Sequence, residues 1–112
     1  MTGYSRGDVV LVRYQASIEA EPWLRPAVVV SSETYHQGRG QLLLAAVTSA
    51  ERQPQPGDTV VQGWKEAGLL RQSLVTGLLL TVTPDAIERR LGALSAQDAQ
   101  GVESSLRLSL GV

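Results

Sequence analysis

A run of contiguous apolar residues, Ala27-Val28-Val29-Val30, directly follows Pro26 and constrains the fold more than any other segment. Its apolar side chains do not alternate with polar ones, which is the pattern of a strand covered on both faces. We therefore predict a strand over residues 27–32, at the centre of a sheet. A chain of 112 residues supports one hydrophobic core but not two, so residues 1–112 are expected to form a single domain.

Further β-branched and apolar runs predict strands on both sides of this one. They cover residues 9–14, 41–48, 59–61 and 73–82. Gly77 interrupts the last run, so we expect a bulge there, and a leucine-rich helix is the alternative for that segment. Polar stretches predict loops over residues 15–25 and a turn over residues 33–40, while the prolines and glycine of residues 53–58 exclude a helix. The pattern of residues 64–70 fits a helical turn or an irregular connection equally well.

Two helix starts follow the last predicted strand. Thr83-Pro84-Asp85 has a capping hydroxyl, a proline at the first helical position and an acidic first turn, which predicts a short helix to about Leu91. Ser95 caps a second helix, along which Val102, Leu106 and Leu110 recur at helical spacing and predict an apolar stripe packed on the sheet. Strands followed by a terminal helix, with no βαβ alternation, predict a mainly β, antiparallel α+β or small-barrel domain.

Charge and composition exclude several classes of function. The formal net charge is −1, so the whole molecule has no general attraction for nucleic acid or for an anionic membrane, and any RNA site must be a local patch. The absence of cysteine excludes a disulfide framework, a thiolate nucleophile and a cysteine-ligated metal. The polar start and the lack of a long apolar run predict a cytoplasmic protein without membrane contact.

Four sequence blocks, in this order, resemble the MazF/PemK family of toxins. They are Arg6-Gly7-Asp8-Val9-Val10-Leu11-Val12, Arg25-Pro26-Ala27-Val28-Val29-Val30-Ser31-Ser32, Ala46-Val47-Thr48-Ser49, and Ala67-Gly68-Leu69-Leu70 continued through Ser73 to Leu94. Together they cover most of the chain. The order of an Arg-Pro strand, a strand that ends in Val-Thr-Ser and a later Arg-Leu-Gly-Ala-Leu-Ser segment is far more specific than any single block.

The resemblance implies an SH3-like antiparallel β-barrel of the MazF/PemK/CcdB type with a C-terminal helix. It also implies the toxin of a type II toxin–antitoxin system, a homodimer that cleaves single-stranded RNA, mRNA in particular, and so inhibits translation and growth. Such toxins use neither a metal nor a cofactor, and a cognate MazE-like antitoxin occupies the RNA groove. These expectations come from the family and not from composition or periodicity.

Two residues match the family's catalytic positions. Arg25 is expected to bind the phosphate and stabilise the transition state, because a guanidinium fork fits phosphate oxygens and stays charged at physiological pH. Thr48, at the end of a predicted strand, is expected to donate a hydrogen bond to a non-bridging oxygen, and Ser49 to assist in RNA binding. The alternatives are a surface charge at a strand start for Arg25 and ordinary strand and turn residues for Thr48 and Ser49.

Three further residues are candidates for RNA contact. Trp23 could stack on an unpaired base, since it lies two residues before Arg25. His36 is the only histidine, and it lies with Arg39 in the predicted turn, where the family usually has asparagine. The alternatives are a structural indole, a loop histidine and a solvated arginine. Trp64 fits a core or interface anchor better than an RNA contact.

The predicted strand from Ser73 to Thr81 departs from the family pattern. Many relatives have charged or polar residues in this strand, whereas this chain has Thr76, Gly77, Leu78 and Leu80. Two alternatives therefore stand beside RNA cleavage: a non-catalytic toxin of the same fold that binds a protein such as DNA gyrase, and a degenerate member that acts only through its antitoxin. The scaffold alone does not separate them, because the site decides the chemistry.

Overall fold

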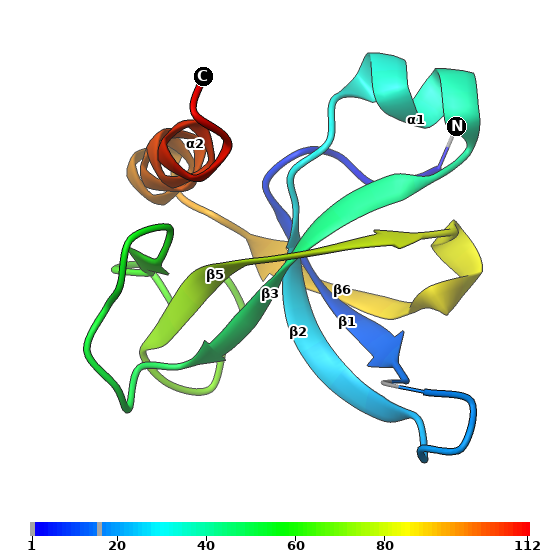
Figure 1. Cartoon of the computed structure of the whole chain (residues 1–112), viewed down its shortest axis with the longest axis horizontal. Helices are drawn as coiled ribbons and strands as arrows, with labels where there is room; N and C mark the ends of the chain where they lie inside the picture. Colours follow the sequence, from blue (N-terminus) through cyan, green and yellow to red (C-terminus); the bar gives the residue numbers. More distant parts are fainter. Residues whose placement is uncertain (1, 16) are drawn as a thin grey trace.

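The computed structural model describes residues 2–15 and 17–112, and its main feature is one six-stranded antiparallel sheet (Figure 1). The strands are β1 (Asp8–Tyr14), β2 (Trp23–Val29), β3 (Leu42–Ser49), β4 (Thr59–Val60), β5 (Ser73–Val82) and β6 (Ile87–Ala93). Their order across the sheet is β4-β5-β3-β2-β1-β6, which leaves β4 and β6 as its edges. The mainly β fold with a C-terminal helix is therefore confirmed, as an open sheet that is not closed into a barrel.

The central position predicted for the apolar run is confirmed, although the strand covers residues 23–29 instead of 27–32. β2 pairs with β1 on one side and with β3 on the other. Its buried residues alternate between two core clusters: Val28 packs with Val9 and Val47, whereas Ala27 and Val29 pack in the other cluster. Because both faces of β2 are covered, no position in this part of the strand needs to be polar.

Helix α1 (Glu33–Arg39) replaces the predicted turn over residues 33–40. The Oγ of Ser32 accepts a hydrogen bond from the backbone N–H of Tyr35, at 3.2 Å, and so caps the N-terminus. Gly40 ends the helix at a φ of +65°, and its N–H donates to the carbonyl of His36 at 2.8 Å. Gly40 therefore marks a helix C-terminus and not a turn between two strands.

Strand β6 is the largest error of the sequence-based prediction, which placed a helix from Pro84 to about Leu91. The predicted start is present, but only as a single 3-10 turn, η1 (Pro84–Ala86). The chain then extends and pairs with β1, with Arg90 opposite Val10. This pairing satisfies an edge of β1 that would otherwise be exposed, and such tertiary pairing outweighs the local helix signal.

The terminal helix α2 (Ala96–Leu110) begins as predicted, with the Ser95 hydroxyl accepting from the N–H of Asp98 at 3.1 Å. Val102 is buried and Leu106 packs against the core, but Leu110 is 62% exposed. The predicted stripe thus covers the sheet only along the first part of the helix. In Figure 1, α2 lies beside the segment that leads into β4, apart from α1.

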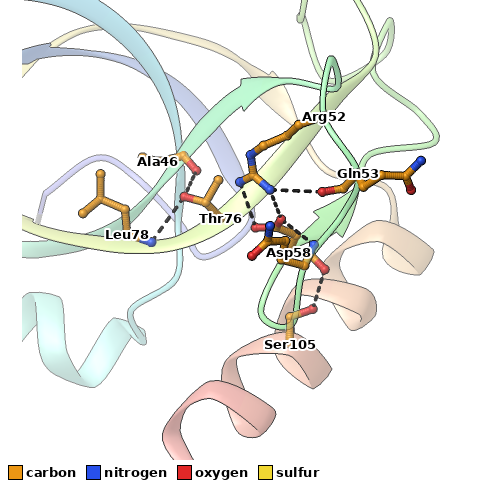
Figure 2. Close-up of polar contacts among 8 residues, drawn as sticks. Ala46, Arg52, Gln53, Asp58, Thr76, Leu78 and Ser105 are labelled. Atoms are coloured by element: carbon orange, nitrogen blue, oxygen red, sulfur yellow. Dashed lines mark hydrogen bonds and ion pairs between the residues drawn. The ribbon is translucent and has the colours of Figure 1, made fainter.

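The bulge predicted at Gly77 is present in β5. Residues 76–78 face the single β3 residue Ala46, because Leu79 pairs with Ala45 and Val75 pairs with Val47. The Thr76 hydroxyl fills the gap: it donates to the Ala46 carbonyl at 2.8 Å and accepts from the N–H of Leu78 at 3.2 Å (Figure 2). The hydroxyl therefore replaces the backbone groups that the bulge removes from the ladder.

An ion pair closes the turn between β3 and β4 (Figure 2). The Asp58 carboxylate, whose side chain is 6% exposed, accepts from Arg52 Nη1 at 2.6 Å and from the N–H of Gln55 at 2.9 Å. The Asp58 carbonyl also accepts from Ser105 of α2, at 3.2 Å. The turn that holds the start of β4 is thereby connected to the terminal helix.

Asp58 should contribute acid-sensitive stability. The hydrogen bond from Arg52, followed by that from Gln55, holds the pKa of this carboxyl below its ordinary value of 3.8, against the effect of burial. The stabilising contribution is complete at pH values above 3.8 and disappears as the pH falls through the lowered pKa. We expect Asp58→Asn to lower the free energy of unfolding by about 1 kcal/mol near neutrality, since Arg52 is half exposed.

Denaturant unfolding across the acid range measures this effect. The difference between wild type and Asp58→Asn should shrink as the pH falls well below 3.8. Glu51→Gln, which changes a carboxylate that is 76% exposed, is the control and should leave the acid dependence as in the wild type. A constant difference at every pH would contradict the role of the Arg52–Asp58 pair.

Candidate active site

A cavity of about 460 Å³ opens where the end of β3 meets the starts of β2 and β5, next to β6. In Figure 1 the end of β3 and the start of β5 lie in the lower left and β2 begins at the lower right, all away from α1. The cavity combines cationic, hydroxyl and apolar side chains; we call it the basic cavity, and its lining is Leu11, Arg25, Pro26, Val47, Thr48, Ser49, Gly68, Leu69, Leu70, Arg71, Ser73, Arg89 and Leu91.

Three of the six predicted site residues meet in the basic cavity. Arg25 enters it from the start of β2, and Thr48 and Ser49 from the end of β3. The two hydroxyl residues are partly buried and pair with Leu74 and Ser73 of β5. A guanidinium and a hydroxyl at one cavity can together donate hydrogen bonds to the oxygens of a phosphate group.

Trp23 lies beside the cavity, half exposed, and contacts Arg25. The Arg25 guanidinium carbon is 4.3 Å from the centre of the indole ring. The indole is also stacked with Tyr14, at 6.2 Å between ring centres. A flat cation held over a ring loses part of its rotational freedom, so Trp23 orients Arg25 at the mouth of the cavity.

His36 and Arg39 lie in α1, which precedes the start of β3, whereas the cavity lies at the end of that strand. The length of β3 separates them by a distance on the order of 20 Å. His36 is 1% exposed, and its Nε2 is 2.6 Å from the hydroxyl of Ser31, while Arg39 packs over Tyr35. The structure thus brings neither residue to Arg25 and Thr48. Their predicted contact with RNA stays a prediction.

Two arginines of the basic cavity, Arg71 and Arg89, were missed by the sequence analysis. The sequence analysis assigned Arg89 to a helix. A helix assignment does not show whether Arg89 or the adjacent Arg90 faces the cavity. In a strand, neighbouring side chains point to opposite faces: Arg89 lines the cavity, whereas Arg90 pairs with Asp8 at 3.1 Å. Simple alternation along β6 would not have separated them, because register shifts put Ile87 in one core cluster and Leu91 against the other.

Two glycines bring the wall of the cavity together. A Cβ atom on Gly92 of β6 would lie 2.6 Å from the Ala67 carbonyl oxygen, and one on Gly68 would lie 2.2 Å from the Leu91 carbonyl oxygen. Only glycines permit this approach of two backbones. The approach holds the segment that leads to Arg71 against the strand that carries Arg89.

Trp64, in the turns before this segment, packs against the core, as its anchor interpretation predicted.

The basic cavity has an excess of positive charge. Three of its lining residues are arginines, and none of the described residues that line it is acidic. This contrasts with a formal net charge of −1 for the chain. The cavity is therefore a local basic patch on a chain whose net charge is slightly negative.

Solved structures share this fold closely. An endoribonuclease from a mycobacterial species, in complex with its cognate antitoxin, matches with a TM-score of 0.79 at 15% identity, over 98% of this chain and 97% of that one. MazF from a MazE-MazF complex of Deinococcus radiodurans matches with a TM-score of 0.77 at 17% identity, over 97% of each chain. The toxin MazF-mt6 of Mycobacterium tuberculosis matches with a TM-score of 0.76 at 15% identity, over 94% of this chain and 97% of that one.

The sequence itself decides the family. The family model of the PemK-like, MazF-like toxins of type II toxin–antitoxin systems matches residues 5–110. The chain belongs to this family. A comparison with curated proteins finds no match. The resemblance of the four sequence blocks to MazF/PemK toxins is thus confirmed, and no helix in residues 2–15 and 17–112 is long and apolar enough to span a membrane.

Proposed function

We propose that this chain is a toxin that cleaves single-stranded RNA in the basic cavity, without a metal or cofactor, and inhibits translation and growth. The observation that carries the proposal is the meeting of Arg25 with Thr48 and Ser49 in a cavity whose lining, among the described residues, holds three arginines and no carboxylate. Membership of the PemK/MazF family supports the same activity. The gyrase-binding and degenerate alternatives gain no comparable support from the residues that line the cavity.

The proposed reaction is attack of a ribose 2′-oxygen on the adjacent phosphorus. The 2′-hydroxyl loses its proton to water as the new bond forms, and the bond from phosphorus to the 5′-oxygen breaks. The 5′-oxygen takes up a proton from water, which leaves a 2′,3′-cyclic phosphate and a 5′-hydroxyl. Arg25 donates to the non-bridging oxygens as negative charge accumulates on them, and Thr48 adds a hydroxyl donor. Because Arg25 stays protonated at any physiological pH, its role is electrostatic and not that of a general base.

The proposal extends to the partners of the chain. We expect a homodimer in the cytoplasm, held inactive by a MazE-like antitoxin that covers the RNA site. The similar mycobacterial endoribonuclease was solved with its cognate antitoxin, which supports the second expectation. Exposed leucines support the first: Leu78 on β5 and Leu108 and Leu110 on α2 are each more than half exposed. An isolated chain would leave these leucine side chains in water.

The ends of the cleavage products test the reaction type. A long single-stranded RNA should yield fragments with 2′,3′-cyclic phosphates and 5′-hydroxyls. Polynucleotide kinase should label the 5′-hydroxyl ends without prior phosphatase treatment. The same sequence with 2′-O-methyl groups should remain intact, because the nucleophile is blocked. Products with 5′-phosphates, or cutting of the methylated strand, would contradict this mechanism.

A further inference from the structure

We propose that Arg71 and Arg89 form a second phosphate subsite, which binds the RNA backbone next to the phosphate held by Arg25. This inference rests on the proposed function in one respect, that the ligand is a single-stranded nucleic acid. It adds two binding residues that come from β6 and from the segment before β5, and not from the strands that hold Arg25 and Thr48.

The strand register sets the spacing between the two subsites. Arg89 of β6 lies opposite Leu11 of β1, and Leu11 lies opposite Pro26, the neighbour of Arg25. Two steps between adjacent strands separate the backbones of Arg89 and Pro26 by about 10 Å. Both Arg25 and Arg89 are among the residues that line the cavity. One flexible strand can therefore contact both guanidinium groups with different phosphates.

Arg89 is available for a ligand. It is exposed, and among the described residues its guanidinium has no hydrogen-bond or ion-pair partner. The adjacent Arg90, in contrast, pairs with the largely buried carboxylate of Asp8. The Arg89 guanidinium is therefore free to bind an anion at the cavity that also contains Arg25.

Arg71 is held only weakly by its own partner. Its Nη1 lies 3.5 Å from Glu51 Oε1, and the two side chains are 67% and 76% exposed. Exposed pairs of this kind contribute about 0–1 kcal/mol, so a phosphate can replace the carboxylate with little loss. Glu51 therefore competes with the ligand for Arg71.

The lining between the two cationic groups favours a nucleotide over a small anion. Leu11, Leu69 and Leu91 provide apolar surface in the same cavity as the arginines. A sugar or a base can cover this surface while its flanking phosphates bind the guanidinium groups. A free phosphate would use only the charged part of the cavity.

Salt-dependent binding of an oligonucleotide that cannot be cut tests the subsite. The probe is a short, fluorescent 2′-O-methyl RNA of randomised sequence, measured by anisotropy. Each lost phosphate contact lowers the slope of log K against log salt concentration by about 0.7. Arg71→Gln and Arg89→Gln should each show this decrease, with binding weakened about tenfold at low salt.

Two further variants make the test specific. Arg107→Gln changes an exposed arginine of α2, paired with Glu103 and outside the cavity, and should leave the slope unchanged. Glu51→Gln should act in the opposite direction and tighten binding about twofold, because it frees Arg71. A merely structural role of Arg71 would not produce this opposite effect.

Unchanged slopes in the Arg71 and Arg89 variants would overturn the subsite, as would a wild-type chain that binds poly-glutamate but not the oligonucleotide. The readout does not depend on cleavage, so the two proposals fail separately. If the wild type cuts RNA but Arg89→Gln has the same salt slope as the wild type, the proposed function stands and the subsite does not. If Arg89→Gln lowers the salt slope but the wild type cuts no RNA, the subsite stands and the proposed cleavage does not.

Discussion

Arg25→Ala should lower the single-turnover rate of RNA cleavage by about 10²- to 10³-fold, the usual cost of removing one donor to a developing oxyanion. Arg25 is the cavity residue best placed to act on the phosphate, since Trp23 orients its guanidinium and two hydroxyl residues enter the same cavity. Arg25→Lys should recover only part of the rate, because an ammonium keeps the charge but loses the planar fork.

Quench-flow or gel assays with enzyme in excess measure this rate, and thermal unfolding shows that the variants fold. Arg107→Ala is the matched control, an exposed arginine on α2 that should cut as fast as the wild type. If Arg25→Ala and Arg107→Ala cut equally fast, Arg25 has no part in the chemistry.

Gly68→Ala should destabilise the protein by about 3 kcal/mol or more. The new Cβ would lie 2.2 Å from the Leu91 carbonyl oxygen, and the φ of +81° already disfavours any other residue. The backbones of the 67–71 segment and β6 would have to separate, which moves Arg71 away from Arg89. The melting temperature should fall by about 10–20 °C.

Gly38→Ala is the matched control for this substitution. Gly38 lies in α1, and a Cβ there meets nothing within 4 Å. Alanine should raise the stability by about 0.5–1 kcal/mol through its helix propensity. Calorimetry or thermal circular dichroism compares the two variants, and a Gly68→Ala protein as stable as the wild type would contradict the proposed close approach of the two backbones.

The hydrophobic pattern was enough to predict β1, β3, β4, β5 and α2 and the central place of β2, because each of them buries apolar residues of its own segment. It was not enough for β6. The segment from Thr83 begins with a genuine helix signal, and only pairing with β1 extends it from Ile87 onward. The cause of the extended conformation of β6 is its pairing with β1, which is not encoded in the sequence of the segment itself.

The same limit applied to the site. Arg25 and Thr48 could be found because they lie in motifs that resemble a family, and the structure brings them together. Arg89 could not be found, since a helix assignment hides which of two adjacent arginines faces the cavity. Arg71 depends on the approach of Gly68 to Leu91, a contact between segments that no local pattern encodes. The prediction of a turn over residues 33–40 was wrong, and it made His36 a candidate for RNA contact. In the structure α1 buries this side chain.

The measurement that tests the central claim most directly is incubation of the purified protein with a long single-stranded RNA in excess EDTA, beside the Arg25→Ala variant, with all new ends mapped. Metal-independent cleavage in the basic cavity predicts discrete cuts that survive chelation and disappear in the variant. An intact RNA, cuts that EDTA abolishes, or the same cuts in Arg25→Ala would contradict the account.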